Sequence, residues 1–583
     1  MEDVEVAWVK SVGEWRNLER GPVISLDLET TSLDISSAGI SAVSWSFNDK
    51  RGYVSGFGPP VSDYLNMLAG SVDKIITHNG MNFDLPILDR HGVVLPREKS
   101  WDTMLSAYVL GRDLGLKTRA LRELGILMET YDRVSGGEKD SSRVDPWMLF
   151  PYAATDAVVP LLLYEKDRRE VKDRNLWEAI NIEHELSPIF VEMQVRGIAF
   201  DRVRAIELQK ELGAHIEEVA ERAVEQAGVP FNLNKPEDVS WVLFDRLKIP
   251  PVKKTKGGEW STDESVLKAR IENHPVVSTI MEYRQWHKQK STYIDSPIRL
   301  SENDGRLHTV FKQFGARGGR SSSEHPNLQN IPQRRGWDKK IKALYLPDEG
   351  CELWSFDYNQ LEMRVAAAIT EDPELMRIFI EDRDIHSENI VSILGRRPGN
   401  PDDRRLSKNI GFGLMYGLSA RGLNEYLLYR AEPPIALSMK EIVRIRSNFL
   451  RRFSVLAEVQ EDWRREVDGL GYVDTPVFRY RRYLPEVFSG DDKYVSEAER
   501  VAVNLKIQGP AGVITKLAMV RLRKYRELFR NTVHDQVLAS IPVKWGPVVS
   551  EEIAREMVRT GEEVLGIPVK VAYERGRTWA ECK

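Results

Sequence analysis

The stretch Cys351–Arg364, C-E-L-W-S-F-D-Y-N-Q-L-E-M-R, most constrains what this chain can fold into. Its apolar run Leu353–Phe356 ends in Asp357, and a helical pattern of apolar residues follows. A carboxylate at the end of a buried strand is held rigidly, and its oxygens suit a hard divalent cation such as Mg²⁺. Asp357 with Gln360 three positions later also fits a capping box for the following helix. The stretch alone therefore leaves a metal ligand and a structural cap as alternatives.

Length and composition limit the class of protein. With 583 residues the chain is too long for one hydrophobic core, so we expect two or more domains. Its 42% hydrophobic and 29% charged residues are typical of soluble globular proteins. The acidic start lacks the features of a signal peptide, and no apolar run approaches the roughly 20 residues of a membrane span. Two cysteines exclude a disulfide framework, and the net charge of −5 does not by itself indicate nucleic-acid binding.

The N-terminal third contains carboxylates in strand, loop and helix patterns. Val23–Leu28 predicts a strand, and period-two alternation sends Asp27 and Glu29 to the same face, either to share a metal or to form an exposed polar face. Asp84 ends the turn-rich stretch H-N-G-M-N-F-D, where an aspartate is ordinarily a cap or turn residue. Tyr152 and Asp156, four residues apart in a helical pattern, share one helix face.

The order D-x-E, N-x-x-x-F-D, Y-x-x-x-D over roughly residues 20–165 resembles the three exonuclease motifs of the DnaQ-like 3′→5′ exonucleases. The resemblance implies an RNase H-like fold with helices over Trp101–Thr103 and Leu116–Gly125. It also implies that four carboxylates hold two Mg²⁺ ions around a phosphodiester and that Tyr152 orients the attacking water. These four metal ligands would be Asp27, Glu29, Asp84 and Asp156. Because all of them are present, we expect an active nuclease.

The middle of the chain predicts helices and a basic loop. The charged helical stretch Glu165–Arg174 is typical of a linker into a second unit. Glu185–Asp201 predicts an amphipathic helix closed by Gly197, and Ala205–Gln226 predicts another long helix. The loop around Lys253, Lys254 and Lys256 suits phosphate contact, although such runs are more often solvated surface loops.

Two further patterns in the C-terminal half suit nucleotide chemistry. Arg404, Lys408, Phe412 and Tyr416 step by four residues along one helical stripe, which could grip a triphosphate at one end and stack on a base at the other. The alternative is the ordinary face of an amphipathic surface helix. Asn531–Leu538 predicts two short strands meeting at a tight hairpin that projects Asp535 into a cleft. There it serves the turn or, with Asp357, completes a two-metal site.

Several long motifs in order closely resemble those of family A (Pol I-like) DNA polymerases, from about residue 180 onward. D-Y-N-Q-L-E-M-R is similar to motif A, R-R-L-S-K-N-I-G-F-G-L-M-Y-G to motif B, and V-H-D-Q to motif C. G-G-R-S-S-S, P-N-L-Q-N-I-P and E-R-V-A-V-N-L-K-I-Q-G also match. The resemblance implies an α/β multidomain chain: an exonuclease domain over 1–175, then a right-hand polymerase over 176–583. Its thumb would span about 195–300, its palm about 301–370 and 471–583, and its fingers about 371–470.

The resemblance also assigns roles by position. Asp357 and Asp535 would bind two Mg²⁺ ions, for which Mn²⁺ can substitute. Glu362 would crowd the ribose 2′ position and so favour deoxynucleotides. The other residues expected around the incoming nucleotide are Arg404, Lys408, Phe412, Tyr416, Gln360 and His534. The residues expected to contact primer–template DNA, His534 again among them, are Arg320, Arg334, Arg500, Asn504 and Gln508, with Lys253, Lys254 and Lys256 on the basic loop.

Three departures from the family pattern stand out. Gly411 replaces the usual Asn and could loosen the fingers helix, Gly318 replaces a common Thr, and Gln536 replaces the Glu of motif C. Because Gln carries no charge, a metal-supporting role at position 536 is in doubt. We expect no separate 5′ nuclease domain, since the exonuclease pattern starts within the first thirty residues, as in phage and organellar replicases.

These expectations amount to a monomeric, DNA-templated DNA polymerase with 3′→5′ proofreading that acts in DNA replication. Its partners would be primer–template DNA, dNTPs and accessory replication proteins, with no membrane. Its location would be the cytoplasm of a bacterium or a virus-infected cell, with an organelle as alternative. Two rival functions are an exonuclease whose C-terminal part only binds DNA and a single-subunit RNA polymerase. The intact aspartates argue against the first rival, and Glu362 with the exonuclease motifs argues against the second.

Overall fold

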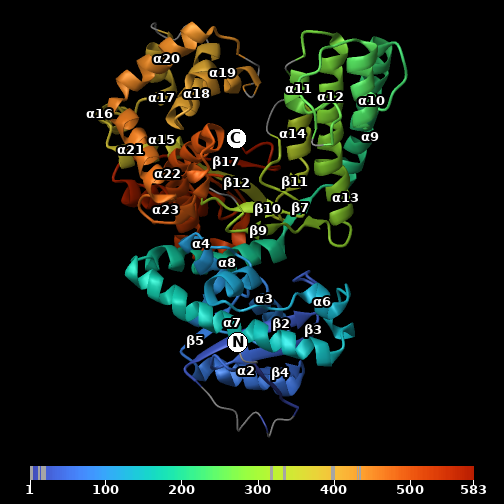
Figure 1. The fold of residues 1–583 in the computed structure, drawn as a ribbon, viewed down its shortest axis with the longest axis vertical. Coiled ribbons are helices and arrows are strands. Elements are labelled where there is room, and N and C mark those ends of the chain that lie inside the picture. Colours follow the sequence, from blue (N-terminus) through green and yellow to red (C-terminus); the bar gives the residue numbers. More distant parts are fainter. Residues whose placement is uncertain are drawn as a thin grey trace.

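Three lobes surround a central sheet in the computed structural model of the protein. An N-terminal lobe lies below, and two helical lobes rise above it on either side of strands β12 and β17 (Figure 1). The predicted α/β multidomain class is therefore confirmed. The structure describes residues 4–10, 14, 21–255, 257–268, 270–315, 319–332, 336–394, 401–429, 431 and 435–582.

The N-terminal lobe is built on a six-stranded mixed sheet in the order β1-β4-β3-β2-β5-β6. Its strand β2 pairs antiparallel with β3 and parallel with β5. Helix α7 packs on β2, β3 and β4, so the apolar side chains of V-I-S-L-D-L-E-T are covered. The strands are β1 (Glu5–Trp8), β2 (Val23–Thr30), β3 (Ile40–Ser46), β4 (Arg51–Gly56), β5 (Lys74–Thr77) and β6 (Ser100–Asp102). The helices are α2 (Pro59–Ser71), α3 (Asp84–Arg90), α4 (Thr103–Leu110), α5 (Leu116–Arg119), α6 (Tyr131–Ser135) and α7 (Pro146–Asp173).

One local prediction in this lobe needs adjustment. Trp101 and Asp102 belong to strand β6 rather than to a helix, and α4 begins only at Thr103 because the Asp102 carboxylate caps it by accepting the Met104 N–H. Helix α7 is long and apolar enough to cross a membrane by composition, but 61% of that apolar window is buried inside the fold. Burial against β2, β3 and β4 identifies α7 as a core helix.

The central sheet is antiparallel in the order β15-β16-β12-β17. Its strand β12 contains the predicted apolar run Leu353–Phe356, which is buried, and extends beyond it at both ends. Helix α23 packs on β12, and α22 packs on α15, α23 and α8, so one hydrophobic core joins the sheet to its helices. These elements are α8 (Trp177–Arg196), β12 (Cys351–Tyr358), α15 (Leu361–Thr370), α22 (Asp492–Arg521), β15 (Phe529–Val533), β16 (Gln536–Pro542), α23 (Gly546–Leu565) and β17 (Val571–Gly576).

The two helical lobes flank this sheet. One is built on α9, which covers and extends the predicted helix over 205–226 and packs along α12. Its helices are α9 (Arg202–Ala227), α10 (Pro236–Ser240), α11 (Glu264–Lys268), α12 (Pro275–Lys290) and α13 (Ser296–Leu300), with α14 (Trp337–Lys342) nearby. The other contains α16 (Pro373–Ile380), α17 (Ile385–Leu394), α18 (Pro401–Met415), α19 (Ala420–Tyr429), α20 (Met439–Arg452) and α21 (Ser454–Leu470). Smaller sheets join β11 (Tyr345–Leu346), β7 (Ile198–Phe200) and β8 (Arg306–Leu307); β10 (Ser322–Glu324) and β9 (Val310–Lys312); and β13 (Tyr472–Asp474) and β14 (Arg481–Tyr483).

A buried ion pair ties α8 to α22 at the base of the central sheet. Lys516 Nζ lies 2.6 Å from Glu183 Oε1, and the two side chains are 3% and 0% exposed. Tyr480 donates to the same carboxylate at 2.8 Å and Gln313 donates to its other oxygen at 2.8 Å. If either Lys516 or Glu183 lost its partner, a desolvated charge would remain inside the fold. The network therefore couples α8 to α22.

We expect Lys516→Met to destabilise the protein by about 3–5 kcal/mol, because it leaves the Glu183 carboxylate buried without its cation. Thermal and urea denaturation of the full chain measure this. Adding Glu183→Gln should recover much of the loss, and Lys524→Met at an exposed ion pair is the matched control with little effect. Equal effects of Lys516→Met and Lys524→Met would contradict the assignment.

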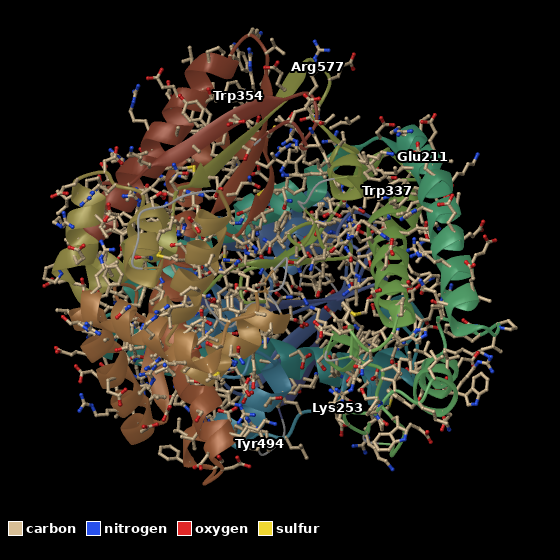
Figure 2. All side chains as sticks on the ribbon, turned by 90° about the horizontal axis from the view of Figure 1, so that it is seen from above. Glu211, Lys253, Trp337, Trp354, Tyr494 and Arg577 are labelled. Atoms are coloured by element: carbon tan, nitrogen blue, oxygen red, sulfur yellow. The ribbon has the colours of Figure 1, made fainter. Side chains whose placement is uncertain are left out.

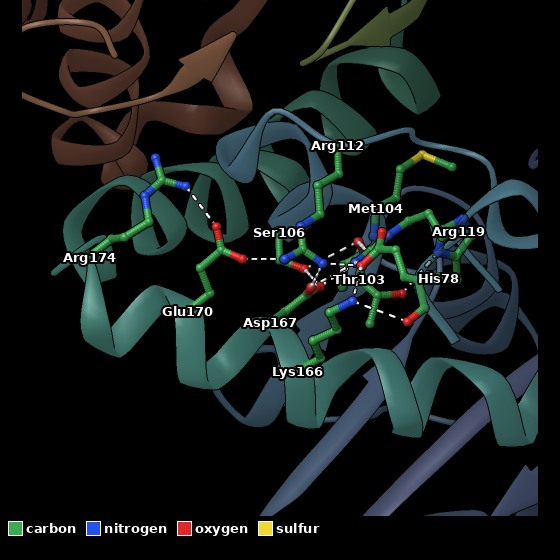
Figure 3. A network of polar contacts seen from close by, with 12 residues as sticks. His78, Thr103, Met104, Ser106, Arg112, Arg119, Lys166, Asp167, Glu170 and Arg174 are labelled. Carbon is green, nitrogen blue, oxygen red and sulfur yellow. Dashed lines mark hydrogen bonds and ion pairs between the residues drawn. The ribbon is translucent and has the colours of Figure 1, made fainter. Parts of the chain in front are cut away.

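A second polar network runs along α7 toward the rest of the chain (Figure 3). The fully buried Arg119 donates to Asp167 at 2.7 Å, and Arg112 contacts Asp167 and Glu170. Glu170 also accepts from Arg174 at 3.1 Å, and Arg174 in turn reaches Asp474 of β13 at 3.3 Å. The N-terminal lobe is therefore anchored to the β13–β14 hairpin by charged side chains as well as by packing.

His184 on α8 joins the lobes through a neutral ring. Its Nε2 accepts the Asp102 N–H at 2.8 Å while Nδ1 lies 2.7 Å from the Ile180 carbonyl oxygen. Burial lowers the pKa of His184 to about 4, so the unfolded chain binds a proton before the folded one does. The stability contributed by the neutral ring is thus complete above pH 6.5 and is lost as the pH falls toward 4.

Lowering the pH from 7 to 5 should therefore reduce the free energy of unfolding of the wild type by about 1 kcal/mol more than that of His184→Gln. This figure allows for the partial exposure of the ring. Urea denaturation at both pH values measures the difference. The exposed His287→Gln is the matched control and should follow the wild type. An unchanged pH slope in His184→Gln would refute this role of the ring.

Candidate active sites

Asp357 lies on strand β12 of the central sheet, and Asp535 lies on the turn between its strands β15 and β16. Asp357 is opposite Gln536 in the β12–β16 register, and the predicted hairpin between β15 and β16 turns at His534, whose φ is 55°, and Asp535. The Asp535 carbonyl oxygen accepts the Tyr358 N–H at 3.3 Å, which holds the turn against the end of β12. Sheet pairing thus brings together two carboxylates that are 178 positions apart.

The capping-box alternative for Asp357 is wrong. Helix α15 begins at Leu361, its N-cap is Gln360 with a φ of 56°, and its N-terminus receives no side-chain hydrogen bond from that residue. Gln360 instead donates to Asp384 at 3.0 Å. Asp357 belongs to the strand and is open to a cavity.

The surroundings of both carboxylates favour a cation. The protein around Asp357 desolvates it and, with the charge of Asp535, raises its pKa to about 6. Burial also raises the pKa of Asp535, whose Oδ1 has no hydrogen-bond partner among the described residues. Arg320 Nη2 lies 3.7 Å from that oxygen and forms an ion pair with Glu362, itself 9% exposed. An unpartnered buried oxygen beside a second carboxylate is a donor set that a divalent cation would satisfy.

Arg320 reaches this position because two backbones approach closely. A Cβ on Gly319, whose φ is 78°, would lie 3.1 Å from the Gly509 carbonyl oxygen, and one on Gly512 would lie 3.0 Å from the Arg320 nitrogen. Larger residues at these glycines would push the Arg320 loop away from α22. The same face of α22 carries Arg500, Asn504 and Gln508, spaced at one helical turn.

A cavity of about 420 Å³ opens beside Asp357 toward the helical lobe of α16–α21. Arg404 and Lys408 of α18 line it, and Arg404 Nε lies 3.1 Å from Asp384. Sequence reasoning missed Asp384 and His386, which line the same cavity. Burial lowers the pKa of His386 to about 4. Their only sequence signal is the D-I-H-S start of α17, where Asp384 accepts the Ser387 N–H as a helix cap does.

Three residues of the predicted stripe, Arg404, Lys408 and Phe412, lie on α18, and Tyr416 continues it beyond the helix end. Lys408 Nζ lies 6.0 Å from the Phe412 ring centre, and Phe412 stacks on Tyr416 with ring centres 6.3 Å apart. Tyr416 lies just beyond the helix end at Met415. Gly411 stands inside an intact helix, where a Cβ would lie 3.1 Å from Asn389 Nδ2 of α17. This glycine therefore lets α17 and α18 pack closely, which is a different effect from the expected loosening.

Gln536 is held by a hydrogen bond in which its side-chain amide is the donor, a role that a glutamate carboxylate cannot take. Its Nε2 donates to Ser355 Oγ at 2.6 Å, next to Asp357 on β12. A glutamate would have to accept the Ser355 hydroxyl proton instead and would add a third negative charge beside Asp357 and Asp535. The Gln536–Ser355 pair thus fixes the side chain without charge.

The predicted DNA contacts are not all in one place. Lys253 pairs with Asp263 at 2.9 Å, and Lys254 lies over the Trp260 ring at 4.8 Å, on the loop between α10 and α11. Neither lines the two cavities that contain Asp357. Figure 2 shows Lys253 on the green lobe, across the view from Trp354 of β12. Arg334, Lys256 and Gly318 lie outside the described residues.

The four N-terminal carboxylates also face one another. Asp27 and Glu29 are on β2, Asp84 is the first residue of α3 and accepts the Leu28 N–H at 2.9 Å, and Asp156 is on α7. Burial raises the pKa of Asp84 to about 7 and, with the charge of Asp156, raises that of Glu29 to about 8. Burial and Asp84 raise the pKa of Asp27 too.

Tyr152 lies on α7 one turn before Asp156, with its hydroxyl 3.0 Å from Lys117 Nζ. Sequence reasoning missed Lys117, because one lysine in a short helical stretch carries no distinctive pattern. In the described part of the chain, no three Asp, Glu, His or Cys side chains are already arranged around a single ion position. Four mutually repelling carboxylates nevertheless form an all-oxygen set that fits a hard divalent cation.

Comparisons with known proteins agree with this division into two carboxylate-bearing regions. Residues 203–581 match the model of DNA polymerase family A, and residues 14–172 match a 3′-5′ exonuclease model. The thermostable DNA polymerase I of Thermus aquaticus is 36% identical over 71% of this chain and 50% of its own length. The DNA polymerase I of Borreliella burgdorferi is 29% identical over 97% of this chain and 63% of its own.

Solved structures give the same result for the fold. The POL domain of Pol1 from M. smegmatis, in complex with DNA primer-template and dNTP, has a TM-score of 0.85 and 27% identity, covering 99% of this chain and all of that one. The chain spans about half the length of the Thermus relative that it matches. It belongs to DNA polymerase family A and carries a 3′-5′ exonuclease domain before the polymerase domain.

Proposed function

We propose that this protein is a DNA-templated DNA polymerase that adds dNMPs to a primer 3′-hydroxyl and removes mismatched ends with its 3′→5′ exonuclease. The observation that carries the proposal is that Asp535 directly precedes Gln536, the residue that pairs with Asp357, and that Asp357 lines a cavity together with Arg404 and Lys408. A carboxylate pair next to a cationic cavity suits a phosphoryl transfer from a nucleoside triphosphate.

Both domains belong to metal-dependent families, and we propose two Mg²⁺ ions per site, replaceable by Mn²⁺. Asp357 and Asp535 would hold them in the polymerase site, and Asp27, Glu29, Asp84 and Asp156 in the exonuclease site. Bound ions of this kind activate the attacking oxygen and neutralise charge that develops on the phosphate. Arg404 and Lys408 would bind the triphosphate, with His386 at the same cavity wall.

The remaining side chains would select and position substrates. Phe412 would pack near the sugar, Tyr416 by the templating base, and Gln360 near Glu362. The buried Glu362, fixed by Arg320, would exclude a ribose 2′-hydroxyl, and comparing dNTP with rNTP incorporation tests this role. Arg320, Arg334, Arg500, Asn504, Gln508 and His534 would contact the primer–template near its end, with Lys253, Lys254 and Lys256 farther along the duplex.

We also propose the subdivision into exonuclease (1–175), thumb (about 195–300), palm (about 301–370 and 471–583) and fingers (about 371–470). Helices α9–α13 fall in this thumb and α16–α21 in these fingers, on either side of β12 (Figure 1). The protein would act as a monomer in the cytoplasm, during replication, with accessory replication proteins.

Extension of a primer with a mismatched 3′ end in Mg²⁺ tests both activities at once. With all four dNTPs we expect removal of the mismatch followed by extension, and without dNTPs only shortening of the primer. Chelation of the metal should stop both. Shortening without extension under any condition would favour the rival function, an exonuclease with a DNA-binding C-terminal part.

A further inference from the structure

Lys117 is placed against two side chains of the exonuclease site. Its Nζ lies 3.0 Å from the Tyr152 hydroxyl oxygen and 3.2 and 3.4 Å from the two Asp156 oxygens. The same ammonium is 4.1 Å from the centre of the Tyr152 ring, within cation–π range. A lysine side chain has four rotatable bonds, so three simultaneous contacts restrict it strongly.

The neighbourhood of Lys117 holds it in this position. Lys117 lies in the short helix α5, and Arg119 two residues later is completely buried. Arg119 donates to the Thr103 carbonyl oxygen at 2.7 Å and pairs with Asp167 of α7 (Figure 3). Because α5 is fastened to α4 and α7 in this way, the Lys117 ammonium is carried by a rigid segment, although its side chain is 30% exposed.

We infer that Lys117 is a positioning residue of the exonuclease site, which fixes the Tyr152 hydroxyl as a hydrogen-bond donor and shares Asp156 with the metal. This inference rests on the proposed exonuclease function. An ammonium has only donors, so the Tyr152 oxygen must accept from it, and the phenolic proton then points to another oxygen. That oxygen is Asp156 in the free protein and the attacking water or a phosphate oxygen when substrate is bound.

The charge of Lys117 has a second consequence. Asp27, Glu29, Asp84 and Asp156 repel one another, and Lys117 partly offsets that repulsion while no metal is bound. A cation that binds Asp156 must share its oxygens with Lys117. Lys117 should therefore weaken metal binding slightly while orienting Tyr152 for the reaction.

A double-mutant cycle on single-turnover degradation of a labelled single-stranded oligonucleotide tests the inference. We expect Lys117→Met to lower the rate by about 10- to 100-fold, and Lys117→Met with Tyr152→Phe to be no slower than the slower single variant. Lys117→Arg, which keeps a charged donor, should recover part of the rate. The matched control Lys139→Met removes an exposed lysine of the same domain and should leave the rate unchanged.

Titration with Mn²⁺ by electron paramagnetic resonance gives a readout independent of turnover. The Asp357→Ala, Asp535→Ala background leaves the exonuclease carboxylates as the only proposed metal ligands. On this background, Lys117→Met should bind Mn²⁺ at least as tightly as the parent. A wild-type rate in Lys117→Met, multiplicative effects in the double variant, or weaker Mn²⁺ binding would each overturn the inference. If the wild type degrades no oligonucleotide, the proposed exonuclease function fails, and the Mn²⁺ comparison alone decides on Lys117. If Lys117→Met does not fold, Lys117→Gln against Lys117→Arg repeats the test.

Discussion

Asp535→Ala is expected to lower the rate of primer extension by about a thousandfold or more while 3′-end degradation continues at the wild-type rate. The carboxylate lies on the β15–β16 turn directly before Gln536, which pairs with Asp357, and no other described carboxylate replaces its position. Removing one of two ligands at a two-metal site removes charge stabilisation that is needed only in the transition state. Single-turnover incorporation of one dNMP into a matched primer–template measures the effect.

The variant should fold normally. Burial raises the pKa of Asp535, so the charged form is disfavoured in the free protein, and Asp535→Ala should leave the thermal midpoint unchanged or raise it. Glu349→Gln changes an exposed carboxylate just before the opposite end of β12 and is the matched control for extension. Extension that survives Asp535→Ala would show that the central sheet does not carry the polymerase site.

Asp27→Ala with Glu29→Ala should have the reciprocal effect. We expect the rate of removal of a mismatched primer end to fall by about a thousandfold or more, because the two carboxylates on β2 are half of the proposed set of four. Extension from a matched primer should be unchanged. The measurement is the rate of mismatch excision without dNTPs, with matched extension on the same preparation as internal reference.

The same pair should also change stability in a direction that a damaged fold would not. Burial and mutual repulsion raise the pKa of Asp27 and that of Glu29, so removing both should raise the thermal midpoint in a chelator. Divalent cations should stabilise the wild type more than the variant, since they bind the folded carboxylates. Asp49→Ala, at an exposed turn of the same domain, is the control. Undiminished excision in the double variant would refute the nuclease site.

Local sequence patterns were sufficient to predict features that lie within a single strand, hairpin or helix. The strand around Leu353–Phe356, the hairpin at His534–Gln536 and the helix that carries Tyr152 and Asp156 all follow from periodicity and turn chemistry. Capping predictions were less secure, because a cap and a metal ligand use the same residue types. Gln360 fitted a capping box, yet its left-handed backbone turns its side chain toward Asp384.

The sequence by itself determined the motif residues and the two families, because D-x-E, D-Y-N-Q-L-E-M-R and V-H-D-Q are contiguous or nearly so. Only the tertiary structure decided which residues from distant segments share a site. Lys117 carries no local signal, and the only signal for His386 is the D-I-H-S start of a helix. They reach Asp156 and the cavity beside Asp357 through the packing of α5 on α7 and of α17 beside α18. Side-chain contacts between elements depend on how the helices and sheets pack, and periodicity along one element contains no information about that packing.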